Sequence, residues 1–302
     1  MMDPIIDEES QEALENEIAD LELRLRKAKD RLATSKAAPT PGTPSHPPSG
    51  PPSAHSAHHY LLLLSDSALP LGSFAFSSGL ESFLAHTRRS GSGPSHHLSS
   101  ASSFSSFLPL SLSSYASTSL PFVLAAHRDP DPGNIAHLDD TLDAALICTV
   151  GRRASVAQGR ALLAIWEKSF AGTVDPAARL APYAELLRSS PNTKSEDPPP
   201  ASAHLAPLFG AVAALCGMSI QQAAYVFMLG HVKALVSAAV RAGLFGPYQA
   251  QRILGGNEVQ VCLKEAVERE WGTPVEEAGQ SVPVMDLWIG RHELLYSRIF
   301  NS

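Results

Sequence analysis

The sequence predicts an all-α protein: a globular helical domain in which one buried, apolar central helix is wrapped by other helices. No stretch alternates between polar and apolar residues for long, so β-strands are not expected. Residues 220–242 are apolar nearly all round, which is typical of a helix in the centre of a domain. Helix signals also recur, such as the Ser219–Gln222 capping box before that helix and Gly243 after it.

The first 59 residues differ in composition from the rest. Residues 1–35 predict an amphipathic helix, because apolar residues recur at spacings of four and three among charged ones: Leu14, Ile18, Leu21, Leu25, Ala28 and Leu32. Such a helix could form a short coiled coil, dock on the main domain or be only partly formed. Residues 36–59 hold seven of the 24 prolines together with Ser and His, which favours a disordered linker.

The main domain is expected over residues 60–302, beginning with an apolar segment interrupted at a Gly-Ser-Phe step. Ser78 and Glu81 have the spacing of a capping box and predict a helix over 79–87. Further helices are expected over 104–127, 135–150, 152–170, 204–217, 220–242 and 247–271, the last with a candidate break at Gly255–Gly256. Two low-complexity insertions rich in Ser, Pro or Asn are expected near 88–106 and 189–203.

Composition limits the kinds of partner and location. Hydrophobic residues make up 44% of the chain, enough for a sizeable core, and the net charge of −7 argues against binding nucleic acid. The three cysteines are far apart in apolar stretches, which indicates free thiols in a reducing compartment. The N-terminus is acidic and Leu61–Leu64 is far too short to span a membrane, so we expect a cytoplasmic protein without a membrane partner.

No catalytic motif or cofactor site is evident. A GxxxxGK[ST] phosphate loop, HExxH and GxSxG are all absent. Asp139 and Asp140 are adjacent and are expected to be solvated or close to a helix start. His231 falls on the predicted central helix and is interpreted as a core histidine rather than a ligand. We therefore expect no enzyme activity, no metal and no cofactor.

Four blocks in order resemble the UreF-type urease accessory proteins. They are LLLLSDSALPLGSFAFSSGLE from Leu61, RRASVAQGRALLAIW from Arg152, the stretch from His204 through the Ala-rich helix to Gln251, and HELLYSRIFNS from His292. The resemblance covers residues 60–302 without the serine-rich insertion. It implies an all-α, dimeric, non-enzymatic scaffold. Its implied partners are a UreD-like protein (also called UreH), a UreG-like GTPase and apo-urease, into which the assembly inserts nickel.

The resemblance also marks candidate residues. Those with a structural or interface role are Pro70, Gly72, Phe74, Phe76, Ser78, Gly79, Glu81, Gly159, Arg160, Arg241, Gly246, Gln249 and Gln251. Some of these have simpler interpretations. Pro70, Gly72 and Gly79 could shape a turn into a helix, and Glu81 could only cap a helix. Arg241 could complement the helix dipole or tie loops together.

The final segment is the best candidate for binding a partner, because aromatic and Arg residues are common interface anchors. Its candidate residues are Leu295, Tyr296, Ser297, Arg298, Ile299 and Phe300. Docking of this segment on its own domain is the alternative. A different class of function is a helical small-molecule-binding or catalytic domain with a site around His204, Gln249 and Gln251.

Overall fold

The computed structural model describes residues 57–66, 73–90, 100–174, 178–189 and 201–301, which belong to one compact unit. Every regular element in these ranges is helical, so the predicted all-α class is confirmed. The predicted helix of residues 1–35, residues 36–56 of the predicted linker, Pro70, Gly72, and residues 91–99 and 190–200 of the two insertions lie outside the described residues. The linker was predicted to extend to residue 59, but residues 57–59 belong to the first helix that the structure describes.

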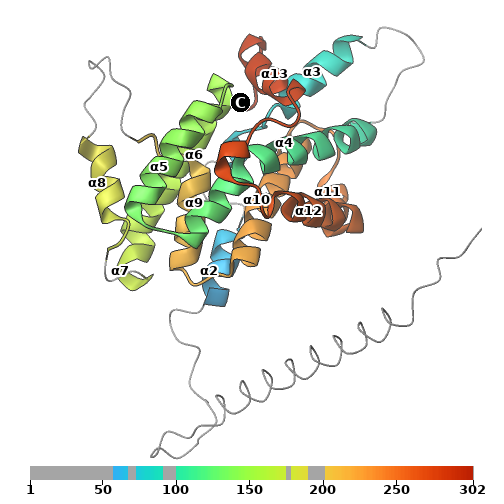
Figure 1. The fold of residues 1–302 in the computed structure, drawn as a ribbon. Coiled ribbons are helices and arrows are strands. Elements are labelled where there is room, and N and C mark those ends of the chain that lie inside the picture. Colours follow the sequence, from blue (N-terminus) through green and yellow to red (C-terminus); the bar gives the residue numbers. More distant parts are fainter. Residues whose placement is uncertain (1–56, 67–72, 91–99, 175–177, 190–200, 302) are drawn as a thin grey trace, which may run out of the picture. The chain divides into compact units, whose positions relative to one another are not determined.

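The helices follow the chain in the order shown in Figure 1. The first half contains α2 (Ala57–Leu64), the 3-10 helix η1 (Ser73–Ala75), α3 (Leu80–Ser90), α4 (Ser100–Arg128), α5 (Pro132–Ala145), α6 (Thr149–Ile165) and the π-helical turn η2 (Trp166–Phe170). The second half contains α7 (Ala171–Val174), α8 (Ala181–Ser189), α9 (Leu205–Leu215), α10 (Ile220–Arg241), α11 (Pro247–Gly255), α12 (Asn257–Glu270), η3 (Val275–Glu277), α13 (Val284–Arg291) and η4 (His292–Leu294).

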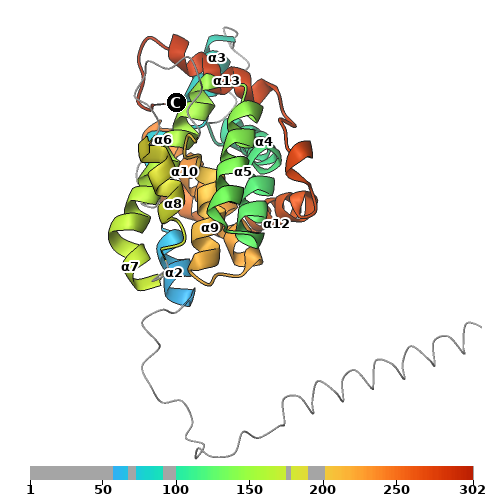
Figure 2. The same ribbon diagram turned by 60° about the vertical axis from the view of Figure 1, so that its left-hand side comes forward.

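The core lies where α4, α9 and α10 pack against one another (Figures 1 and 2). In α9 every residue except Ala214 is buried, so this helix is more completely enclosed than α10, whose Gln221, Gln222 and Tyr225 are exposed. A Cβ at Gly210 would lie 2.2 Å from the carbonyl oxygen of Val123, so glycine allows α9 to approach α4 closely. The α10 helix is long and apolar enough for a membrane span, but 61% of its most apolar window is buried inside the protein.

The serine-rich α4 begins at Ser100, so residues 100–106 form part of this helix rather than of an insertion. Its hydroxyls bond to carbonyls of the preceding turn, as in Thr118 Oγ1 to Ser114 O at 2.8 Å and Ser117 Oγ to the same oxygen at 3.2 Å. These bonds satisfy hydroxyls that would otherwise be costly to bury beside the apolar side chains of α4. Serine content therefore did not prevent a long, largely buried helix.

Several local predictions at helix ends are confirmed. Ser219 Oγ accepts the Gln222 N–H at 3.2 Å, and Gln222 Oε1 accepts the Ser219 N–H at 2.9 Å, which completes the predicted capping box. Gly243 has a φ of +73° after the end of α10, a conformation that favours glycine. The predicted break is also present, because α11 ends at Gly255 and α12 begins after Gly256.

The expectation that Asp139 is solvated was wrong. Asp139 is completely buried, and its carboxylate accepts the N–H groups of Ser202, Ala203 and His204 at 2.5, 3.1 and 2.5 Å. These amides precede α9, so Asp139 on α5 neutralises the positive end of that helix. Its partners lie more than 60 residues away in the sequence, where no local pattern indicates them.

Candidate functional site

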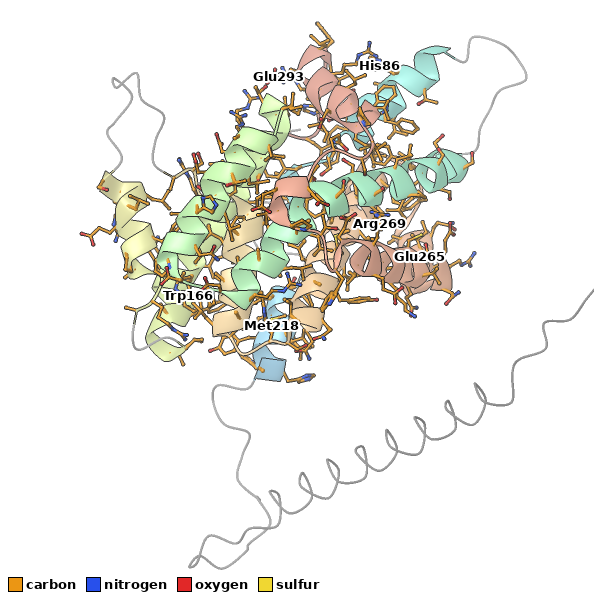
Figure 3. The ribbon with its side chains drawn as sticks, in the orientation of Figure 1. His86, Trp166, Met218, Glu265, Arg269 and Glu293 are labelled. Atoms are coloured by element: carbon orange, nitrogen blue, oxygen red, sulfur yellow. The ribbon has the colours of Figure 1, made fainter. Side chains whose placement is uncertain are left out.

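One end of the molecule brings together α3, α13 and the C-terminal residues, as both ribbon views show (Figures 1 and 2). Figure 3 shows Glu293 and His86 at this same end, on η4 and α3 respectively. The α13 helix packs against α3 and α6. A Cβ at Gly79, where φ is +86°, would lie 3.1 Å from the Ile289 backbone nitrogen, so glycine is required by both the backbone and the close approach of α13.

The C-terminal residues are held by backbone hydrogen bonds to distant elements. The Glu81 carboxylate accepts the Ile299 N–H at 2.7 Å and the Phe300 N–H at 3.3 Å. The Asn301 N–H donates to the Ala75 carbonyl oxygen at 2.8 Å. The segment therefore packs along η1 and the first turn of α3, as the docking alternative predicted.

A cation–π contact also holds the same segment. The Arg241 guanidinium lies 4.3 Å from the centre of the Phe300 ring and 5.8 Å from that of Phe74. Arg241 also donates a hydrogen bond to the Phe74 carbonyl oxygen. Phe300 is only 5% exposed, so its ring is an internal anchor and is not available to a partner in this conformation. Arg241 therefore ties η1 and the C-terminal segment together.

His292 completes this arrangement. It is completely buried, and its Nε2 lies 2.9 Å from Glu81 Oε2. Because a carboxylate can only accept when ionised, we assign the imidazole proton to Nε2. The same carboxylate thus contacts both η4 and residues 299–300.

Apolar side chains remain exposed on this end of the molecule. We call them the C-terminal face; they are Val284, Leu287, Leu294, Tyr296 and Ile299. Tyr296 is fully exposed, and Leu294 is 79% exposed. Large apolar side chains that stay exposed make this part of the chain a candidate protein-binding site. Leu295 is half-buried, whereas Ser297 and Arg298 are exposed beside this face.

The predicted capping box at α3 was wrong. Ser78 has a φ of +48°, and the hydroxyl at the helix start belongs to Ser77, whose Oγ accepts the Glu81 N–H at 3.4 Å. The Glu81 side chain instead points to the C-terminal segment. The sequence has the spacing of a capping box, but the Glu81 carboxylate accepts its hydrogen bonds from residues that follow it by 211 to 219 positions in the chain.

The other candidate glycine and arginine on α6 have a structural role away from the C-terminal face. A Cβ at Gly159 would lie 2.0 Å from the Ala203 carbonyl oxygen, so α6 contacts the backbone before α9 directly. Arg160 Nε donates to the Ser202 carbonyl oxygen at 3.2 Å. Gly246 is the N-cap residue of α11, and Phe76 is half-buried.

The structure does not assemble the alternative site around His204, Gln249 and Gln251. His204 is completely buried, with Nδ1 3.0 Å from Ser155 Oγ and Nε2 2.9 Å from Asp143 Oδ1. It is therefore a satisfied core histidine between α5 and α6. Gln249 and Gln251 lie on α11, which packs against α10 and α12 instead.

A partly open pocket of about 110 Å³ lies among α4, α6, α10 and α13. Its wall includes Tyr115 and His231, whose rings stack with centres 4.0 Å apart. His231 Nε2 lies 2.9 Å from Ser111 Oγ, and burial lowers the pKa of His231 to about 3. This histidine is therefore neutral at ordinary pH. Within the described residues no cluster of three metal-binding side chains is present.

The sequence did not indicate the buried roles of His292 and Asp139 or the Ser155–His204–Asp143 network. His292 was marked only as the first residue of the C-terminal block. Its one available signal was a histidine placed between an apolar helix and the aromatic final segment, which does not reveal a buried carboxylate partner.

Comparisons with known proteins agree with the resemblance. The UreF family matches residues 98–256, a range that contains α4 to α11. A relative from Schizosaccharomyces pombe, named uncharacterized urease accessory protein UreF-like, is 36% identical over 247 residues, which is 81% of this chain and 97% of that protein. Urease accessory protein F of Oryza sativa subsp. indica is 30% identical and covers 78% of this chain and 82% of its own length. Urease accessory protein UreF of Paenarthrobacter aurescens is 30% identical and covers 82% of this chain and all of its own.

Proposed function

The chain belongs to the UreF family and is a urease accessory protein rather than an enzyme; we propose that it acts as a scaffold in urease maturation. In this proposal it binds a UreD-like protein, recruits a UreG-like GTPase and so supports nickel insertion into apo-urease. The partners follow from the resemblance of four sequence blocks. The exposed apolar side chains near the C-terminus support the choice of surface.

The observation that carries the proposal is the C-terminal face. Its side chains are apolar and exposed, and at its end the backbone of residues 299–301 is held by hydrogen bonds to Glu81 and Ala75, with the Phe300 ring packed against Arg241. A held backbone lowers the entropy cost of binding, because fewer conformations are lost when the partner arrives. Tyr296 is the expected anchor, since a fully exposed tyrosine gains most from being covered by a partner.

The experiment is co-expression with a UreD-like protein, followed by sizing and titration of the complex. Tyr296→Glu should weaken the complex at least tenfold, because a truncated interface anchor commonly costs about 2 kcal/mol or more. Tyr248→Glu is the matched control: Tyr248 is 92% exposed, but it lies on α11. Equal affinity for both variants and the wild type would show that the C-terminal face does not bind the partner. Absence of any complex with the wild-type protein would contradict the proposed scaffold role.

A homodimer within the complex is part of the same proposal. A shallow groove between α10 and α12, lined by Tyr225, Val261 and Trp271 among others, is another exposed apolar surface that a second copy could cover. Tyr225→Arg should then shift the complex to half its mass on sizing without loss of helix content. An unchanged mass would exclude this groove as the dimer surface.

We also place this assembly in the cytoplasm. The three cysteines carry free thiols in the structure, which suits a reducing compartment. Fractionation of cells that express the protein tests this location, and recovery in a secreted or membrane fraction would contradict it.

A further inference from the structure

We propose that Glu81 is a positioning residue that builds the partner-binding surface by closing residues 292–300 into a fixed loop. The inference rests on the proposed function of the C-terminal face, but it concerns a residue that does not itself meet the partner. The Glu81 side chain is only 12% exposed, and both carboxylate oxygens are occupied inside the protein.

One carboxylate holds both ends of this loop. At its start, His292 on η4 lies 2.9 Å from Oε2. At its end, the N–H groups of Ile299 and Phe300 donate to Oε1 and Oε2 at 2.7 and 3.3 Å. Hydrogen bonds to an ionised acceptor are roughly twice as strong as neutral ones, and here they are shielded from most solvent. The Glu81 carboxylate therefore links the two ends of the loop through hydrogen bonds.

Fixing these two amides decides which side chains face outward. Ile299 is 60% exposed and its neighbour Phe300 only 5%, so the anchored backbone directs one side chain to solvent and the other beneath Arg241. Between the two anchored ends lie the exposed Leu294, Tyr296 and Arg298. The loop thus presents its apolar groups in one arrangement before a partner arrives.

The helix start does not need this carboxylate. The Glu81 N–H is already satisfied by Ser77 Oγ at 3.4 Å, and Leu80 N donates to the Ser77 carbonyl oxygen at 3.0 Å. Removing the Glu81 side chain should therefore release the loop while α3 stays folded. That separation of effects makes the inference testable.

The first measurement is amide hydrogen exchange on the free protein. In Glu81→Ala the amides of Ile299 and Phe300 should exchange at least tenfold faster, whereas protection in α4 and α9 should stay unchanged. Glu81→Gln keeps the size of the side chain but removes the charge, and it should show a smaller increase. Glu293→Gln is the control, because Glu293 lies in the same loop but its carboxylate pairs at the surface with Arg153.

The second measurement is affinity for the UreD-like protein. Glu81→Ala should weaken binding at least tenfold although the substituted position is covered by its own chain. Unchanged exchange in both Glu81 variants would overturn the inference whatever the partner does. Faster exchange with wild-type affinity would overturn the link between the loop and binding. Failure of Tyr296→Glu to weaken the complex would instead count against the proposed function, so the two failures are distinguishable.

Discussion

Two glycine-to-alanine substitutions in helices should change stability in opposite directions. Gly159 on α6 and Gly230 on α10 both lie inside helices, where alanine is favoured over glycine by about 1 kcal/mol. They differ in surroundings. A Cβ at Gly230 would meet nothing within 4 Å, whereas a Cβ at Gly159 would lie 2.0 Å from the Ala203 carbonyl oxygen and 2.6 Å from the His204 carbonyl carbon.

The contact at Gly159 involves backbone that cannot move freely. Ala203 is held at a φ of +70°, and its N–H and those of its two neighbours bond to the Asp139 carboxylate. Overpacking a tight site costs roughly 1–3 kcal/mol. Shifting this backbone also weakens hydrogen bonds to a charged group, each contributing about 1.5–3 kcal/mol. After the helix preference is subtracted, Gly159→Ala should destabilise the protein by about 2–5 kcal/mol.

Thermal unfolding followed by far-ultraviolet circular dichroism measures both variants. For a domain of this size about 1 kcal/mol corresponds to roughly 2–4 °C, so Gly230→Ala should raise Tm by a few degrees. Gly159→Ala should lower Tm by roughly 5–15 °C. If Gly159→Ala is as stable as Gly230→Ala, then α6 does not contact the backbone before α9, and the packing derived for that corner is wrong.

Three further outcomes are expected from the same core. Asp139→Ala should lower the unfolding free energy by about 3 kcal/mol or more in urea titrations, because three buried amides lose their acceptor. A loss under about 0.5 kcal/mol, as is usual for a surface substitution, would contradict this. Ala238→Leu should cost about 1–3 kcal/mol, since Ala238 is completely buried on α10, and an unchanged Tm would show that this face is open. Burial lowers the pKa of His231 from 6.5 to about 3, so the unfolded chain takes up the proton first as pH falls from 6.5. As pH falls below 6.5, this group should therefore lower the unfolding free energy by about 1.4 kcal/mol per pH unit. His231→Phe should show a correspondingly smaller dependence of unfolding free energy on pH. The same pH dependence in the variant and the wild type would refute this prediction.

The structure also refines what truncation can test. Removing residues 293–302 would take away the exposed side chains that are proposed to meet the partner. In the folded protein that deletion would also uncover Glu81, and it would empty the site of the Phe300 ring beneath Arg241. Substitutions at exposed positions such as Tyr296 separate loss of contact from loss of support.

By itself the sequence determined the helical class, the capping of α10, its end at Gly243 and the break between α11 and α12. These features depend on side chains and backbone groups within a few residues of one another, so their signals are local. The four motif blocks also identified the family, which the comparisons confirm.

Only the tertiary structure decided where individual polar groups are satisfied. Glu81 had the local spacing of a helix cap, yet its carboxylate accepts hydrogen bonds from amides 218 and 219 residues away. The buried Asp139 carboxylate likewise accepts hydrogen bonds from amides more than 60 residues away. The physical reason is that a carboxylate takes whichever donors the folded chain brings within about 3 Å in a water-poor environment. That choice depends on how α3, α13, α5 and α9 pack, and no pattern confined to one segment can encode it.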